Sequence, residues 1–223
     1  MPFLVARDGT RLFYKDWGSG PPVVFVHAWS LSSAMWEYQF QAFVAAGFRC
    51  VALDRRGHGR SDQPGSGYDI DTLSDDLCVL VDYLDLREIT LVAHSLGTLE
   101  STRFLARHGS ERVARAAYIC AFTPFLLQAE DNPDGIDPQF VEATLAALQA
   151  DRPKWFADGV PGYFATESTG SWVSAALVED ALRTILDTTL EVQTPCPGAP
   201  AGPTTASGWW TASSWSAGRP DRR

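Results

Sequence analysis

The stretch ITLVAHSLGTLEST, residues Ile89 to Thr102, decides the fold of this chain. It begins with a short apolar run, Ile89 with Leu91 and Val92, which is typical of a buried strand. Apolar or small residues then recur at helical spacing up to Arg107, and the pair His108 and Gly109 is a usual helix stop. The stretch therefore predicts a strand that turns directly into a helix.

The turn itself is predicted to present a reactive serine. Residues 93–97, Ala-His-Ser-Leu-Gly, differ at one position from the G-x-S-x-G nucleophile elbow. So tight a turn needs small residues two before and two after the serine, and Ala93 and Gly97 supply them. Ser95 would then stand above the sheet edge, and the Leu96 N–H at the helix start would be free to donate to an oxyanion. The alternative is an ordinary turn into a helix.

Length and composition point to one soluble domain. The 223 residues suffice for a single α/β core, and 45% hydrophobic with 20% charged residues is ordinary for a globular protein. A net charge of −9 with no basic stripe argues against binding of nucleic acid. No charged-then-apolar leader opens the chain and no run reaches transmembrane length, so we expect no membrane partner and a cytoplasmic location.

Strand and helix patterns alternate through the first half of the chain. An Asp-Gly pair at residues 8 and 9 indicates a hairpin between the first two strands. Later strands alternate with amphipathic helices, which predicts a mostly parallel sheet with helices on both faces. The expected strands are residues 3–6, 12–17, 23–26, 50–53, 89–92 and 116–121, and the expected helices are residues 34–46, 71–86 and 96–107.

The pattern changes after Pro124. Helices are predicted over residues 138–150 and 177–190, with scattered aromatic residues in shorter pieces between them and no strand. We expect residues 1–123 to form the core, 124–190 a helical cap, and 191–223 an aberrant, disordered tail. Packing of the cap against the core accounts for most of its aromatic residues, and the rest could line a pocket.

Three stretches that follow three expected strands carry a resemblance to a known family. They are the run HAWS at residues 27–30, the run DRRGHGRSD at residues 54–62, and the elbow around Ser95. Together they resemble the α/β-hydrolase family, and within it the cofactor-free haloperoxidase, perhydrolase and aryl-esterase branch. The resemblance covers roughly residues 3–192 and implies an α/β-hydrolase fold with a helical cap.

The resemblance also implies roles for individual residues. Ser95 would attack an acyl carbon and form an acyl-enzyme, and the N–H groups of Trp29 and Leu96 would hold the oxyanion. Ala28, His94 and Phe125 are the candidates for the substrate pocket. His27 is expected to orient its loop rather than transfer protons. Neither a metal site nor a cofactor is implied, since the four histidines are dispersed.

The resemblance ends before the family's triad is complete. The family places an acid and then a histidine on loops after late strands, and Glu191 with Val192 looks like the approach to the first of these. From Gln193 onward the sequence has no histidine and none of the residues Leu, Ile, Val, Met, Phe or Tyr. We find no triad acid or histidine, and expect the last strands to be missing. A reading frame that departs near Cys196 would explain this, and a short isoform is the alternative.

The sequence thus predicts a serine hydrolase that acts on carboxylic esters or related acyl compounds through Ser95, impaired by loss of the acid and histidine. A cofactor-free haloperoxidase or perhydrolase, which makes peracids without metal or haem, is the first alternative. A non-catalytic relative that binds a small ligand beneath the cap is the second. The expected partner is a small acyl or ester molecule, and the oligomeric state is left open.

Overall fold

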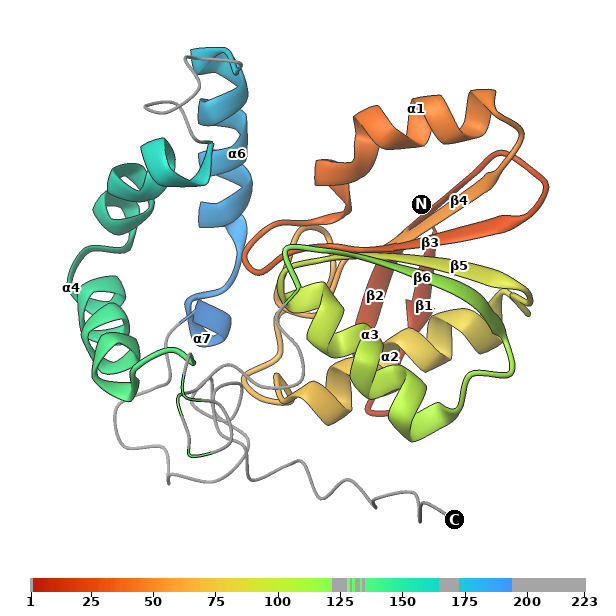
Figure 1. Ribbon diagram of the computed structural model, residues 1–223, viewed down its shortest axis with the longest axis horizontal. Helices are drawn as coiled ribbons and strands as arrows, with labels where there is room; N and C mark the ends of the chain where they lie inside the picture. The colour runs from red at the N-terminus through yellow and green to blue at the C-terminus, as the bar shows by residue number, and fades with distance from the viewer. Residues whose placement is uncertain are drawn as a thin grey trace.

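A computed structural model describes residues 2–121, 128, 130, 133, 135–164 and 173–193. Within them six strands form one sheet in the order β1-β2-β4-β3-β5-β6, and helices flank it (Figure 1). The strands are β1 (Phe3–Val5), β2 (Arg11–Trp17), β3 (Pro22–Val26), β4 (Arg49–Leu53), β5 (Ile89–His94) and β6 (Val113–Ile119). The helices are η1 (Ser33–Trp36), α1 (Glu37–Ala45), α2 (Ile70–Tyr83), α3 (Leu96–His108), α4 (Pro138–Tyr163), α6 (Ala175–Asp187) and α7 (Leu190–Gln193).

The sheet has the predicted mixed, mostly parallel topology. The β1–β2 hairpin is antiparallel, and β2 joins the rest of the sheet antiparallel to β4. The pairs β3–β4, β3–β5 and β5–β6 are parallel. Parallel neighbours need a crossover, and the intervening helices α1, α2 and α3 provide it. The expected α/β-hydrolase core is therefore confirmed.

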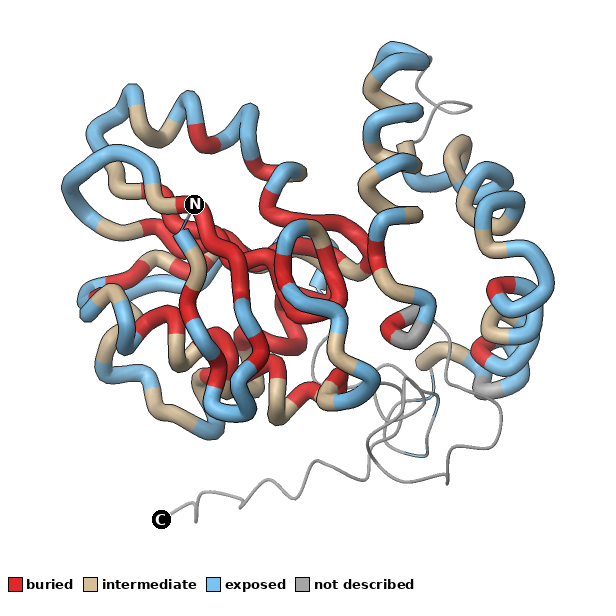
Figure 2. The backbone as a smooth tube through the Cα atoms, turned by 180° about the vertical axis from the view of Figure 1, so that it is seen from behind, coloured by how far each residue is buried: buried red, intermediate tan, exposed pale blue. Residues whose placement is uncertain are grey.

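Both faces of the sheet are covered because the central strands bury side chains on both sides. Val24 and Val26 of β3 face the cluster that includes Leu77 of α2, whereas Phe25 faces α1 and packs on Phe40 with ring centroids 5.0 Å apart. Figure 2 shows the buried residues concentrated in these strands and in the loops at their carboxyl ends. A run of continuous apolar residues is what a parallel strand covered on both faces requires.

The edge of the sheet at β6 is open. Among the described residues β6 pairs only with β5, and residues 114–117 are exposed. Cys120, which follows β6, is exposed as well. Over the described residues the main chain of β6 therefore has a strand partner on one side only.

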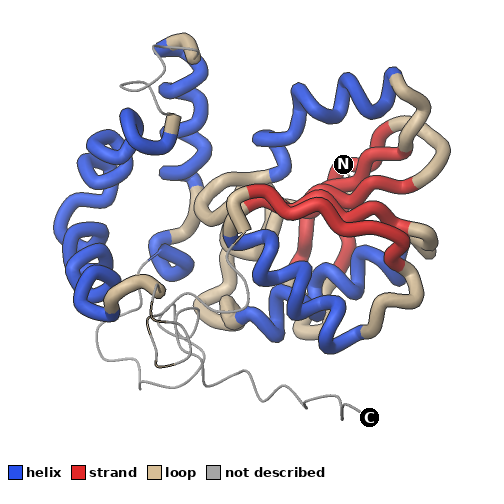
Figure 3. The backbone as a smooth tube through the Cα atoms, viewed as in Figure 1, coloured by secondary structure: helices blue, strands red, loops and turns tan. Residues whose placement is uncertain are grey.

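The helices that follow β6 lie beyond the carboxyl ends of the strands (Figures 1 and 3). The expected helix over residues 138–150 is confirmed, and after a kink at Asp151 a second helical segment that was not predicted continues α4 to Tyr163. Asp151 leaves the helical conformation and accepts a hydrogen bond from the Lys154 N–H at 3.0 Å. It thus caps a second helical segment, in whose first turn Pro153 needs no hydrogen-bond partner.

The expected approach to a strand near Glu191 is also wrong. The structure has the short helix α7 there, and Val192 is 2% exposed beside Tyr68. The Thr189 N–H donates to the Gly57 carbonyl at 2.9 Å, so this turn docks on the loop after β4. Residues 194–223 lie outside the described residues, and the predicted tail and the boundaries at residues 123 and 190 stay predictions.

The close approach of α3 to β3 gives a first prediction. A Cβ at Gly97 would lie 2.6 Å from the Val26 carbonyl oxygen and 2.9 Å from that of His27, so the backbone would have to move. We expect Gly97→Ala to lower the free energy of unfolding by about 1–3 kcal/mol, measured by urea denaturation. Gly162→Ala is the matched control, since a Cβ there meets nothing within 4 Å. Equal stability of Gly97→Ala and the wild type would contradict the close approach.

Candidate active site

Ser95 stands at the junction of β5 and α3 in a strained conformation. Its backbone has φ 53° and ψ −121°, in the region that non-glycine residues avoid. Ser95 caps α3, but its side chain makes no capping hydrogen bond, so the helix does not use the hydroxyl. The Ser95 N–H donates to the Ile119 carbonyl at 2.9 Å and its carbonyl accepts from Thr98. Strain held in this way is typical of a functional residue.

Two backbone N–H groups were predicted to hold an oxyanion at this serine. Leu96 is the first residue of α3, where the helix leaves its N–H unpaired and the helix dipole is positive. Trp29 follows β3, the strand next to β5 in the sheet. Among the described residues neither N–H donates a hydrogen bond within the protein. Both predicted oxyanion donors are therefore available at the carboxyl ends of neighbouring strands.

A cavity of about 260 Å³ opens beside Ser95. The predicted pocket residues Ala28 and His94 line it, whereas Phe125 lies outside the described residues. Helices α4 and α6 close its far side with mostly apolar side chains, so the cavity suits an apolar group. Its lining consists of Ala28, Trp29, Leu31, His94, Ser95, Trp155, Phe156, Gly159, Val160, Tyr163, Phe164, Ala181, Leu182 and Ile185.

The cap side of this cavity contacts the loop that carries Trp29. The Trp29 ring packs against Phe156 and Trp155, with centroids 5.8 Å and 6.3 Å apart. From the sequence, these two residues were predicted only to belong to the helical cap. The contribution of α6 to the cavity was not predicted. Its apolar residues Leu182 and Ile185 follow helical spacing, and that spacing was the available signal.

His94 lines the cavity without acting on Ser95. It is half-buried, and burial lowers the pKa of its imidazole below the ordinary value. Its Nδ1 has no hydrogen-bond partner among the described residues. No hydrogen bond in that part of the chain joins it to Ser95, as expected for side chains that diverge at the turn.

His27 holds its loop, as predicted. Its Nδ1 donates to the Ala28 carbonyl at 2.8 Å and its Nε2 accepts from the Arg55 N–H at 3.0 Å. This pattern fixes a neutral imidazole. Complete burial, with the charge of Arg55 nearby, lowers the pKa of His27 well below 6.5. With both nitrogens engaged, His27 is not a base for Ser95.

The remaining histidines are also placed away from Ser95. His58 is fully buried, and burial together with the Arg55 charge lowers its pKa to about 3. His108 is the last residue of α3, and its Nε2 lies 2.7 Å from a carboxylate oxygen of Asp75. The sequence has four histidines in all. None of them is positioned as a general base for the serine.

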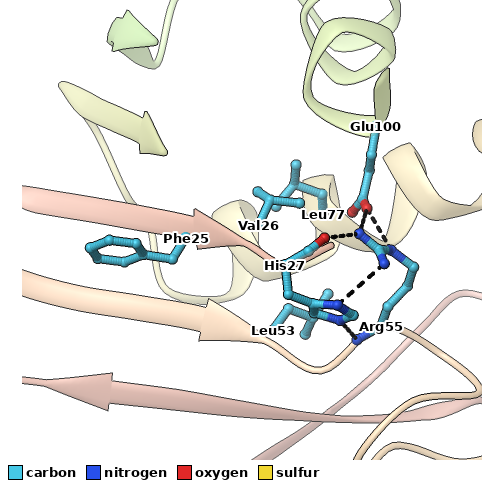
Figure 4. Close-up of a pocket in the computed structure, with 7 residues that line it drawn as sticks. All are labelled: Phe25, Val26, His27, Leu53, Arg55, Leu77 and Glu100. Carbon is cyan, nitrogen blue, oxygen red and sulfur yellow. Dashed lines mark hydrogen bonds and ion pairs between the residues drawn. The ribbon is translucent and has the colours of Figure 1, made fainter. Parts of the chain in front are cut away.

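The loop after β4, residues 54–62, is tied together as expected. The Asp54 carboxylate accepts from the N–H groups of Ser33 at 2.7 Å and Arg60 at 3.0 Å. Two arginines of the loop extend to helices that the sequence did not connect to it. Arg56 forms a bidentate pair with Asp76 of α2, and Arg55 pairs with Glu100 of α3, shown in Figure 4. A glutamate on the buried face of α3 was the available signal for the second pair.

Comparison with known proteins agrees with this geometry. Residues 21–221 match the family described as the alpha/beta hydrolase fold. The chain belongs to this family. It is 42% identical over 174 residues to a non-heme chloroperoxidase of Kitasatospora aureofaciens, which covers 78% of the chain and 63% of that protein. It is 37% identical to a bifunctional esterase/perhydrolase of Acinetobacter calcoaceticus, over 80% of the chain and 66% of that protein.

Solved structures of this family superpose well on the chain. A bromoperoxidase from Bacillus anthracis is 33% identical with a TM-score of 0.79, over 84% of this chain and 70% of that one. An esterase from Exiguobacterium antarcticum is 30% identical with a TM-score of 0.78, over 84% of this chain and 68% of that one. The chain spans about two thirds of the length of the curated relatives named above. Both likenesses support the predicted branch of the family.

In the ranges given above, no group of three or more His, Cys, Asp or Glu residues is arranged to hold a metal ion. Over the same ranges, none of the helices combines the length and the apolar character needed to cross a bilayer.

The buried imidazole of His58 predicts how stability depends on pH. The native state keeps it neutral down to about pH 3, whereas the unfolded chain protonates it near 6.5. Between these values the unfolded state binds more protons, so the free energy of unfolding falls as pH falls, by up to ~1.4 kcal/mol per pH unit.

We expect His58→Asn to flatten that dependence between pH 6 and pH 4, measured by urea denaturation at each pH. His27 and the buried carboxylates are present in both proteins, so the difference in slope isolates His58. Parallel slopes for the two proteins would contradict the buried neutral imidazole.

Proposed function

We propose that this chain is a serine hydrolase that acts on carboxylic esters or related acyl compounds through an acyl-enzyme on Ser95. The observation that carries the proposal is the strained Ser95, whose hydroxyl the helix does not use, at the wall of an apolar cavity. The N–H groups of Trp29 and Leu96 supply the complementary half of the site.

The chemistry follows the usual course of acyl transfer. The Ser95 hydroxyl oxygen attacks the carbonyl carbon of the ester while its proton leaves, and the carbonyl oxygen becomes an oxyanion. The two backbone N–H groups stabilise that charge, which develops only in the transition state. Collapse expels the alcohol with a proton and leaves an acyl-Ser95 ester. Water then attacks this ester, which releases the acid and restores the hydroxyl.

Removal of the Ser95 proton is the step for which the described residues supply no base. In the 223-residue sequence no histidine stands where it could take the Ser95 proton, and no acid is assigned to orient one. Catalysis by backbone donors and substrate binding alone retains about 10³–10⁴-fold over water, far below that of a complete triad. We therefore propose slow acylation, with water as the proton acceptor.

The same acyl-enzyme supports the alternative of a perhydrolase. Hydrogen peroxide would replace water as the attacking molecule, and the product would be a peracid able to oxidise halide. The relatives named as chloroperoxidase and esterase/perhydrolase favour this reading. A non-catalytic protein that binds a small apolar ligand is the third reading, favoured by the cavity and the lack of a base. The proposed partner in every case is a small molecule, and the proposed location is the cytoplasm.

Covalent labelling of Ser95 tests the proposal. A fluorophosphonate probe is expected to label the purified chain slowly at Ser95, and the labelling should vanish in Ser95→Ala, as read by intact mass and peptide mapping. Ser101→Ala, a buried hydroxyl later in α3, is the control and should keep the labelling. Labelling that persists in Ser95→Ala, or a folded wild type that is never labelled, would reject the nucleophile.

The depth of the cavity should govern the size of the acyl group. Gly159 of α4 lines the cavity, and a Cβ added there meets nothing within 4 Å. We expect Gly159→Leu to slow labelling by a long-chain alkyl fluorophosphonate about tenfold relative to a methyl one, since one lost apolar contact is worth roughly 1–3 kcal/mol. Gly162→Leu, one helical turn away and outside the lining, should leave the ratio unchanged. Equal ratios in both variants would show that Gly159 does not limit the pocket.

A further inference from the structure

We propose that the buried ion pair between Arg55 and Glu100 positions the Trp29 N–H as an oxyanion donor and couples it to the Leu96 N–H. The inference rests on the proposed function of the site. In this reading Arg55 and Glu100 are positioning residues, because neither touches the cavity beside Ser95.

Arg55 bonds to the backbone that leads into Trp29. Its Nη2 donates to the His27 carbonyl at 2.8 Å, and its Nη1 lies 3.5 Å from the Ala28 carbonyl. Its Nε donates to the Glu100 carboxylate at 2.7 Å, so the guanidinium bridges α3 and the loop after β3 (Figure 4). A planar guanidinium with several donors can hold all these acceptors at once.

The Ala28 carbonyl is the decisive acceptor because it shares a peptide unit with the Trp29 N–H. That unit is planar and trans, so a bond that fixes the carbonyl also fixes the direction of the N–H, which points the opposite way. His27 donates to the same carbonyl from Nδ1 at 2.8 Å. Donors to the carbonyl oxygen also polarise the N–H on the other side of the peptide.

Glu100 connects this clamp to the second oxyanion donor. It lies in α3, one helical turn after Leu96, whose N–H begins that helix. The ion pair therefore joins the helix that carries one donor to the loop that carries the other. Ser95 caps α3 and lines the same cavity as Trp29, so the pair also sets the distance between Ser95 and that loop.

Burial of both charges costs free energy that offsets their attraction, so this pair adds little net stability to the fold. That favours a positioning role. The two side chains are 2% and 3% exposed, and burial raises the pKa of Glu100 against the opposing effect of Arg55. When apolar residues replace both members of such a pair, the protein is often as stable as before or more stable. Removal of one partner alone destabilises the protein strongly. Both facts are needed to design the test.

The chain contains a matched control in the next residue. Arg56 forms an equally short pair with Asp76 at 2.7 Å, and these side chains are 1% and 4% exposed. This pair ties the same loop to α2, but in the described part of the chain Arg56 makes no hydrogen bond to residues 27–29. Arg56 keeps a second partner, Asp8 at 2.7 Å, when Asp76 is replaced, so the stability of both variants has to be measured. Damage to the oxyanion donors should follow only the loss of the first pair.

The experiment compares Glu100→Gln with Asp76→Asn in the full chain. The readout is fluorophosphonate labelling of Ser95, separated into the maximal rate and the half-saturating probe concentration, with urea denaturation to match stability. We expect Glu100→Gln to lower the maximal rate at least tenfold with little change in half-saturation, because the donors act in the transition state. Asp76→Asn should stay within about twofold of the wild type.

A second variant covers the outcome in which Glu100→Gln does not fold. The double variant Arg55→Met with Glu100→Leu removes both charges and leaves none unpaired, so it is expected to fold and still to lose the maximal rate. Wild-type labelling by this folded variant, or equal rates in Glu100→Gln and Asp76→Asn, would overturn the positioning role alone. A wild-type chain that is not labelled at Ser95 would overturn the proposed function and this role with it.

Discussion

The contact on which this structure depends is the close packing of the first turn of α3 against the carbonyl end of β3. Gly97 lets the helix lie against the Val26 and His27 carbonyls without a side chain between them. The chain can then pass from β5 into α3 without a loop, which forces Ser95 into its positive φ. The same contact brings the loop after β3 beside the start of α3. Ser95 and Trp29 line the same cavity, and the missing Cβ at Gly97 allows this approach.

The sequence was sufficient for the core because local and long-range signals agreed in it. Continuous apolar strands, an Asp-Gly turn and helices with one buried face all favour the same parallel sheet. The elbow could be recognised because its backbone excludes all but small residues near Ser95. The family resemblance implied Ala28 and His94 as pocket residues, and both line the cavity.

The sequence was less informative wherever a contact between distant residues decides the structure. The kink at Asp151 depends on a side-chain cap, the hydrogen bond that the Asp151 carboxylate accepts from the Lys154 N–H. The turn at Val192 depends on a buried contact with Tyr68 and the loop after β4, which no pattern near residue 192 reveals. The ion pair between Arg55 and Glu100 joins residues 45 positions apart, so no local sequence pattern predicts it either.

The exposed strand at the end of the sheet has a consequence for how this protein behaves at high concentration. Along β6 the outward main-chain amides and carbonyls have no described strand beside them, and residues 114–117 are open to solvent. Such a border accepts a strand from any neighbouring molecule, whatever its side chains. Where this border is left free, self-association of the chain would begin along β6.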